Sequence, residues 1–179
     1  MKIFCHSASS LLDLIYGESV DVATATVAVS LFSRKFDMGD PGFPLASGYI
    51  LGQCQNVYSA QNGVGWDVSA IGLDWAAPDA LKRDFCYSGG QQTFSVDVPN
   101  GTYDVRLLMG TITQQQDSMR VAIEGTVVAS SITQAAGTWY DATHVVTVSD
   151  GQMNLTFSDM GGSNPYWVVN AIEIAYHAL

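Results

Sequence analysis

The amino-acid sequence predicts an all-β fold, an antiparallel β-sandwich of the jelly-roll kind that occupies residues 34–179. Beyond Arg34, short runs of alternating apolar and polar residues are separated by Gly, Pro, Asn and Asp, which is typical of strands joined by turns. No stretch there has the period of a long amphipathic helix. We therefore expect one sandwich domain, preceded by an arm or extra strand of residues 1–33.

The arm differs in pattern from the rest of the chain. Ser9 and Ser10 can cap a short helix over residues 11–15, which Gly17 would end. Residues 20–29 (VDVATATVAV) alternate small, β-branched and polar side chains, which favours a strand. We expect the arm to complete the sandwich with this strand or to reach a neighbouring subunit of a larger assembly.

The sandwich begins with a segment of low periodicity, residues 39–85, which is rich in Gly, Pro, Asn and Trp. It predicts a structured loop region, and loops carry function on rigid β-scaffolds. Three hairpins are expected next, with turns at residues 99–101, 124–125 and 150–151, because Asn-Gly, Glu-Gly and Asp-Gly occur between alternating runs. A long alternating strand, Trp167 to Tyr176, closes the chain.

Composition excludes several classes of function. Acidic residues outnumber basic ones by 17 to 7, giving a formal net charge of −10, and without a Lys or Arg stripe the chain is a poor partner for nucleic acid. The spare carboxylates leave room for calcium. No apolar run approaches the ~20 residues that cross a bilayer as a helix.

The first residues do not resemble a secretory signal, because His6, Asp13 and Glu18 interrupt their apolar stretch. We expect Met1 to be retained after cytoplasmic synthesis. An extracellular or virion location would then be reached through assembly, lysis or a non-standard route.

The chain has three cysteines, Cys5, Cys54 and Cys86, with no C-x-x-C spacing and no neighbouring His tract. This predicts neither a zinc site nor a disulfide framework. Buried thiols in a reducing compartment are the favoured interpretation, and one Cys54–Cys86 bridge is the alternative.

Five segments occur in an order that resembles a known family: FDMGDPGFPLASGY, NGVGWD, LKRDFCYSGGQQTFSVDVPNGTYDVRLLMG, QDSMRVAIEG and VSDGQMNLTFSDMGGSNPYWVVNAIEI. They resemble the galactose-binding-like β-sandwich found beside the catalytic domains of rhamnogalacturonan acetylesterases and agarases, with malectin as a more distant relative. The resemblance covers residues 36–174. It implies a jelly roll without catalytic residues that binds sugars through loops and often carries a structural calcium. Residues 113–116 (TQQQ) depart from the family, whose members often have an Asp or His there.

Sugar recognition needs flat aromatic faces flanked by amides and carboxylates. Trp66 is the first candidate for stacking and Tyr166 the second, because both lie in predicted loops beside polar residues. The further candidates are Tyr58, Asn62, Asp67 and Asn164. The alternative for any Trp of a sandwich is a place in the core, which we expect for Trp167.

A calcium ion would require several oxygen ligands. Asp37 in the first strand, with Asn170 and Glu173 in the last, are the candidates, because the family places these two strands side by side. The alternative is that Asp37 caps a turn and Glu173 is a solvated strand residue.

The sequence offers few residue patterns that are typical of a catalytic site. There is no G-x-S-x-G elbow, and His6, His144 and His177 stand without an adjacent nucleophile in the sequence. The sequence predicts a non-catalytic domain that binds a polysaccharide or glycan through loop aromatics. The alternative is a structural or accessory protein, such as a virion surface or tail protein, that contacts itself or other subunits through residues 1–33.

Overall fold

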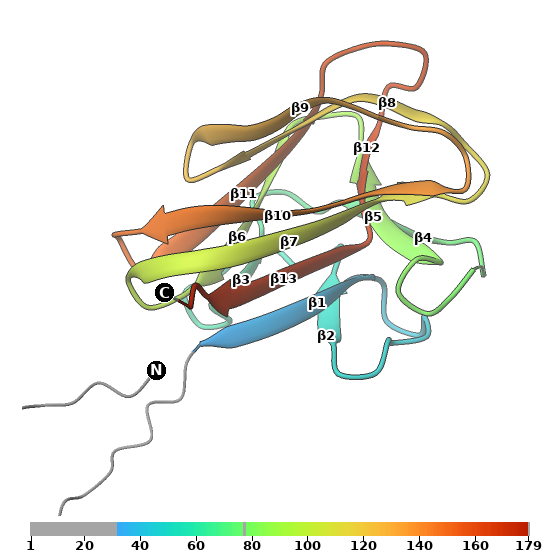
Figure 1. Ribbon diagram of the computed structural model, residues 1–179. Helices are drawn as coiled ribbons and strands as arrows, with labels where there is room; N and C mark the ends of the chain where they lie inside the picture. The colour runs from blue at the N-terminus through green and yellow to red at the C-terminus, as the bar shows by residue number, and fades with distance from the viewer. Residues whose placement is uncertain (1–31, 77, 179) are drawn as a thin grey trace, which may run out of the picture. The chain divides into compact units, whose positions relative to one another are not determined.

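The computed structural model describes residues 32–76 and 78–178. The strands form two five-stranded sheets and one three-stranded sheet (Figure 1). Their bounds are β1 Ser33–Gly39, β2 Ile50–Gln53, β3 Val64–Trp66, β4 Ile71–Asp74, β5 Asp84–Ser88, β6 Gln92–Asp97, β7 Gly101–Thr111, β8 Gln116–Ile123, β9 Thr126–Gln134, β10 Thr138–Val148, β11 Gln152–Asp159, β12 Trp167–Val169 and β13 Ala171–Tyr176. Within these residues, no helix is long and apolar enough to span a membrane.

The two large sheets form the sandwich that the sequence predicts. Sheet A has the order β10-β7-β13-β1-β2 and sheet B the order β3-β6-β11-β8-β9, while β12-β5-β4 form the small sheet C. All pairings are antiparallel except that of β1 with β2. Alternate residues of both large sheets face inward, and the edge-to-face contact of Phe36 with Phe94, 5.4 Å between ring centroids, joins the two layers.

Only one of the three expected hairpins forms. β8 and β9 pair around Glu124 and Gly125, which both have positive φ (51° and 71°), as a tight hairpin turn requires. The turns at residues 99–101 and 150–151 instead carry the chain from one large sheet to the other, so β6 pairs with β11 and β7 with β10. Turn residues specify a reversal of direction, but the sheet that receives the next strand depends on tertiary packing.

The last strand is interrupted at Asn170. β12 pairs with β5 in sheet C, and β13 pairs with β1 and β7 in sheet A. The buried Asn170 side chain makes the hydrogen bonds that the break would otherwise leave open. Its Oδ1 accepts the Gly110 N–H (2.9 Å), and its Nδ2 donates to the carbonyls of Asp84 (2.9 Å) and Lys82 (3.3 Å). The predicted return of the last strand beside the first is confirmed by the register of Phe36 with Ile172.

The expected loop region, residues 39–85, contains strands β2, β3 and β4 as well as loops. A disulfide joins Cys54 to Cys86 in the core, so the favoured interpretation of buried thiols is wrong for these two residues. Sequence spacing could not show the pairing, because 32 positions separate the two cysteines. Folding brings their Cα atoms to 5.3 Å, a usual separation for a disulfide. Cys5 lies outside the described residues.

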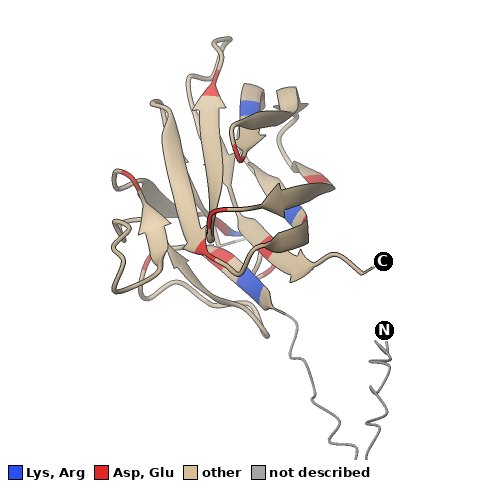
Figure 2. Cartoon of the chain, turned by 90° about the vertical axis from the view of Figure 1, so that its left-hand side faces the viewer, with Lys and Arg blue, Asp and Glu red and all other residues tan. Residues whose placement is uncertain are grey.

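The predicted helix and strand of the arm, and the subunit contacts expected through residues 1–33, fall almost wholly outside the described residues, which include only Phe32 and Ser33 of that segment. In the view of Figure 2, the Lys and Arg positions of the sandwich lie in a few separate segments of the backbone.

Candidate functional site

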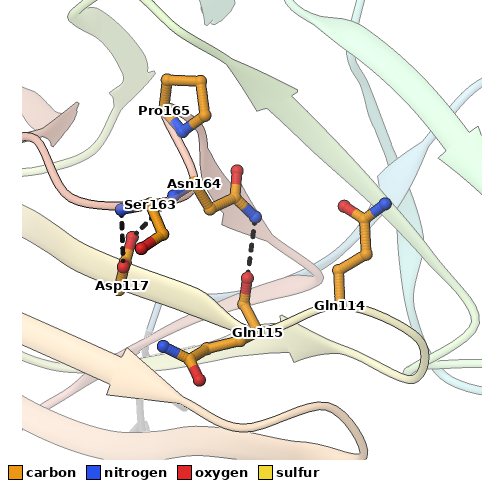
Figure 3. Close-up of a pocket in the computed structure, with 6 residues that line it drawn as sticks. All are labelled: Gln114, Gln115, Asp117, Ser163, Asn164 and Pro165. Atoms are coloured by element: carbon orange, nitrogen blue, oxygen red, sulfur yellow. Dashed lines mark hydrogen bonds between the residues drawn. The ribbon is translucent and has the colours of Figure 1, made fainter.

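A hollow of about 490 Å³ lies between two loops at one end of sheet B (Figure 3). One loop, residues 112–115, joins β7 to β8, and the other, residues 160–166, joins β11 to β12. The lining residues are Gln114, Gln115, Asp117, Ser163, Asn164 and Pro165. We call this hollow the Gln114–Asn164 pocket.

Asp117 holds the pocket's two walls together. Its carboxylate accepts the backbone N–H groups of Ser163 (2.9 Å) and Asn164 (3.1 Å). Gly162 has a φ of +123°, and a Cβ there would lie 2.7 Å from Asp117 Oδ1, so the close approach requires glycine. A bulge at the start of β8, where Ser118 has a φ of 54°, interrupts the register and re-aims Asp117 towards the loop.

The β7–β8 loop is held in place by hydrogen bonds to its backbone carbonyls. Thr111 Oγ1 donates to the Gln114 carbonyl (2.7 Å), and Asn164 Nδ2 donates to the Gln115 carbonyl (2.7 Å). Within the described residues, the side-chain amides of Gln114 and Gln115, the Ser163 hydroxyl and Asn164 Oδ1 have no hydrogen-bond partner. These groups are therefore available to a ligand.

An aromatic surface adjoins the pocket. Tyr166 follows Pro165 and is 43% exposed, and its ring meets Tyr87 edge to face at 5.5 Å. Gly89 packs beneath them, where a Cβ would lie 3.2 Å from the Pro165 carbonyl oxygen. An exposed ring next to unpaired amides and a hydroxyl is the combination that suits a polyhydroxylated ligand.

The expectation that Trp66 stacks on a ligand is wrong. Its side chain is fully buried, with the ring of Trp167 stacked on it at 5.4 Å and the tilted ring of Phe94 at 5.0 Å. β3 pairs with β6, and strand alternation then turns Trp66 inward and its neighbour Gly65 outward. Glycine at position 65 allows the backbone at Tyr58 to pack closely, because a Cβ there would lie 2.5 Å from the Tyr58 nitrogen. Trp167 lies in the core, as the sequence predicts.

Three other predicted residues do not join the pocket. Tyr58 is half-buried and donates its hydroxyl proton to Asp97 Oδ1 (3.0 Å), at the end of β6 where Asn62 also lies. The pocket is at the other end of sheet B. The two ends are roughly 17 Å apart, which is the length of a strand such as β6. Asp67 Oδ1 accepts the N–H groups of Val68 (2.8 Å) and Thr93 (2.9 Å), which is a turn-stabilising role. Of the predicted ligand residues, only Asn164 lines the pocket, and Tyr166 directly follows the lining residue Pro165.

Sequence reasoning missed Gln114 and Gln115. Residues 113–116 were noted only as a departure from the family. The sequence does not show which residues of another loop face these amides in the fold. The short connection between β7 and β8 is the signal that could have drawn attention to them, because short loops at a sheet end project their side chains outward.

The three predicted metal ligands are not brought together as one set. Glu173 accepts the Tyr49 hydroxyl (2.6 Å) and pairs with Lys35 (3.0 Å) and Arg106. Burial alone would raise the pKa of Glu173, but hydrogen bonds from Tyr49, Lys35 and Arg106 hold it below its usual range. Asn170 is occupied at the break between β12 and β13. Both residues therefore have structural partners, which counts against a ligand role.

Asp37 instead shares its surroundings with Asp84, which was not among the predicted metal ligands. Asp37 Oδ2 accepts the Ala46 N–H (2.7 Å). The Oδ1 atoms of Asp37 and Asp84 are both buried without a hydrogen-bond partner. Burial raises the pKa of Asp37 to about 6. Burial and the nearby charge of Asp37 raise the pKa of Asp84 to about 7.

Arg83, which precedes Asp84 in the sequence, pairs with a different carboxylate. Arg83 bonds both oxygens of Asp74 (2.9 and 2.8 Å), which leaves Asp84 free to turn towards Gly39, where a Cβ would lie 2.5 Å from its Oδ2. Two buried carboxylates with unpaired oxygens fit a hard cation such as calcium. No group of three or more His, Cys, Asp or Glu that could hold a metal occurs in the described part of the chain, so carbonyl or water oxygens would have to complete the shell.

Comparison with known proteins agrees with the fold. A family model described as beta-agarase/YXIM esterase-like, galactose-binding domain-like matches residues 34–175. The β-agarase A of Zobellia galactanivorans is 33% identical over 94 residues, which are 52% of this chain and 17% of that protein. The uncharacterized esterase YxiM of Bacillus subtilis is 30% identical over 170 residues, which are 92% of this chain and 41% of that protein. The chain thus spans less than half the length of these curated relatives.

Solved structures share the same architecture. The crystal structure of B. subtilis YxiM superposes with a TM-score of 0.64 at 24% identity, over 82% of this chain and 40% of that one. A β-glucuronidase of Bacteroides uniformis gives 0.62 at 14% identity, over 82% of this chain and 18% of that one. Both likenesses show the fold alone. Because the family model matches most of the chain, from residue 34 to residue 175, the chain belongs to the beta-agarase/YXIM esterase-like, galactose-binding domain-like family.

Proposed function

We propose that this chain is a non-catalytic carbohydrate-binding domain whose ligand occupies the Gln114–Asn164 pocket. The observation that carries the proposal is the set of unpaired polar groups in the pocket beside the exposed Tyr166 ring. Membership of a family of galactose-binding-like domains adds support, and so do the relatives named as an agarase and an esterase.

Each side chain has a role that follows from its chemistry. Tyr166, with Tyr87 against its ring, offers a flat face to the C–H groups of a sugar. The amides of Gln114 and Gln115 can donate and accept, while Asn164 Oδ1 accepts. Asp117 acts indirectly by holding Ser163 and Asn164 in place.

The test is calorimetric titration with agaro-oligosaccharides and a wider glycan panel. Tyr166→Ala should weaken binding by ~1–3 kcal/mol, the range for one aromatic contact. Tyr166→Phe should keep most of the affinity, because the ring remains. Tyr58→Ala is the matched control, since it removes a tyrosine at the other end of sheet B. A flat response to the whole panel, or equal binding by Tyr166→Ala, would overturn the proposal.

The absence of catalysis is part of the same proposal. The two histidines of the described residues contact Tyr140 (His144 Nε2, 3.0 Å) and Asp104 (His177 Nδ1, 2.7 Å). Neither is paired with a serine or cysteine nucleophile, which supports a binding role. Release of reducing sugar or acetate from a bound glycan by this chain alone would contradict it.

We also propose that Asp37 and Asp84 hold a calcium ion of structural importance. An ion between these carboxylates would satisfy the buried Oδ1 atoms and offset their mutual repulsion. Calcium at 100 times its dissociation constant would stabilise the fold by about 2.7 kcal/mol. Melting curves in calcium chloride and in chelator should therefore differ for the wild type and coincide for Asp84→Asn. Glu173→Gln should retain the calcium response, and a melting temperature of the wild type unmoved by calcium would overturn the assignment.

A further inference from the structure

The Gln114–Asn164 pocket lacks a cation. Of its six lining residues only Asp117 is charged, and both oxygens of that carboxylate face backbone N–H groups of the opposite loop. The remaining polar groups are neutral: two glutamine amides, the Ser163 hydroxyl and Asn164 Oδ1. An approaching ligand therefore meets neutral donors and acceptors beside a fixed negative charge.

Most basic residues of the described chain are held by partners away from the pocket. Five of the six are held by a carboxylate or an aromatic ring: Arg34 over Phe32, Lys35 and Arg106 at Glu173, Lys82 at Asp79 and Arg83 at Asp74. The sixth, Arg120, lies on β8 opposite Ser158 of β11 and does not line the pocket. With a formal net charge of −10 for the whole chain, the surrounding field also disfavours anions.

We infer that the pocket selects an uncharged glycan unit, one that bears hydroxyls and neither carboxylate nor sulfate. This inference rests on the proposed carbohydrate-binding function. A sugar hydroxyl both donates and accepts, so it can pair with a glutamine amide and with Asn164 Oδ1. A carboxylate or sulfate only accepts, and it would lose its hydration beside Asp117 without a cation to replace it.

The test compares two galactan oligosaccharides of equal length by calorimetry, a neutral agaro-oligosaccharide and a sulfated carrageenan oligosaccharide, together with an oligogalacturonate. In 20 mM salt the neutral ligand should bind at least ten times more tightly than either charged one. Its affinity should not change between 20 and 500 mM salt, because no ion pair forms. Equal or tighter binding of a charged glycan would overturn the inference and leave the proposed function intact. No binding of any glycan would overturn both.

A charge-insertion variant tests the pocket itself. Gln115→Lys places a cation in the lining at an exposed position, and it should raise affinity for the sulfated ligand at least fivefold relative to the neutral one. Gln61→Lys is the matched control, because it adds the same charge at an exposed site near the other end of sheet B. An equal gain in both variants would mean that net charge, and not the pocket, sets selectivity, which would overturn the inference.

Discussion

At the scale of single residues, the surroundings of an aromatic ring decide its role. Trp66 and Tyr166 were the first and second candidates for stacking in the sequence, Trp66 between Gly65 and Asp67 and Tyr166 directly after Asn164-Pro165. Trp66 stacks on Trp167 in the core, whereas Tyr166 is 43% exposed next to the pocket. The difference arises from strand pairing, because β3 turns Trp66 inward through its register with β6.

This difference predicts effects of very different size for two alanine substitutions on stability. Trp66→Ala should lower the free energy of unfolding by about 3–5 kcal/mol, because it leaves a large cavity in the core. Tyr166→Ala should change it by less than about 1 kcal/mol, as expected for a half-exposed side chain. Urea denaturation followed by far-UV circular dichroism measures both, and a stability loss for Tyr166→Ala as large as that for Trp66→Ala would contradict the assignment.

The buried carboxyls Asp37 and Asp84 predict an unusual pH dependence. Their pKa values in the folded protein, about 6 and about 7, lie above the usual value of 3.8. The folded state therefore binds more protons than the unfolded state between pH 4 and pH 7, so stability falls as the pH rises through this range. The loss is on the order of 3 kcal/mol for each carboxyl.

Denaturation of the calcium-free protein at several pH values should show this fall. Asp84→Asn should flatten it, because the variant removes the carboxyl whose pKa is raised further of the two. Asp150→Asn, at an exposed turn, is the control and should leave the slope unchanged. Stability that is constant or rises from pH 4 to pH 7 without calcium would contradict the buried, uncompensated state of the pair.

At the scale of elements, the break at Asn170 divides the last strand between two sheets. Its side chain takes the place of backbone pairing for Gly110, Asp84 and Lys82. Asn170→Ala should lower the free energy of unfolding by about 2–4 kcal/mol, because it leaves buried backbone groups without partners. Asn100→Ala removes one exposed hydrogen bond, to Ser149, and should cost less than about 1 kcal/mol. Equal effects in a denaturation experiment would show that the break is not held by the amide.

The disulfide joins the β2–β3 connection to β5. Reduction, or replacement of Cys54 and Cys86 by serine, should lower the free energy of unfolding by roughly 2–4 kcal/mol, because the unfolded chain regains the freedom of the closed loop. Urea curves with and without a phosphine reductant measure this effect. The double serine variant is the control, and its curve should not respond to the reductant.

At the scale of the whole molecule, alternation and turn residues are sufficient to predict an all-β sandwich. The placement of its last strand beside its first came from the resemblance to the family. Alternation and turn residues do not predict which sheet each strand enters. The turns at residues 99–101 and 150–151 have the composition of hairpins, yet each crosses between sheets A and B. Which sheet a strand enters depends on which buried faces pack together, as in the contact of Phe36 with Phe94. The local sequence does not indicate this packing.

The candidate site was predictable only in part for a related reason. Asn164 and Tyr166 stand close together in the sequence beside a proline, which indicates an exposed turn. Their partners Gln114 and Gln115 are some 50 positions away, and only the arrangement of β8 beside β11 brings the two loops together. Asp37 and Asp84 are likewise joined by packing, with no spacing in the sequence that indicates it.

The Cys54–Cys86 bond also determines what a protease would leave behind. Lys82 and Arg83 lie inside the loop that this bond closes, in the connection between β4 and β5. A tryptic cut after either residue would therefore produce two polypeptides that stay covalently joined. Such a nicked molecule would migrate as one species on a non-reducing gel and separate into two only after reduction.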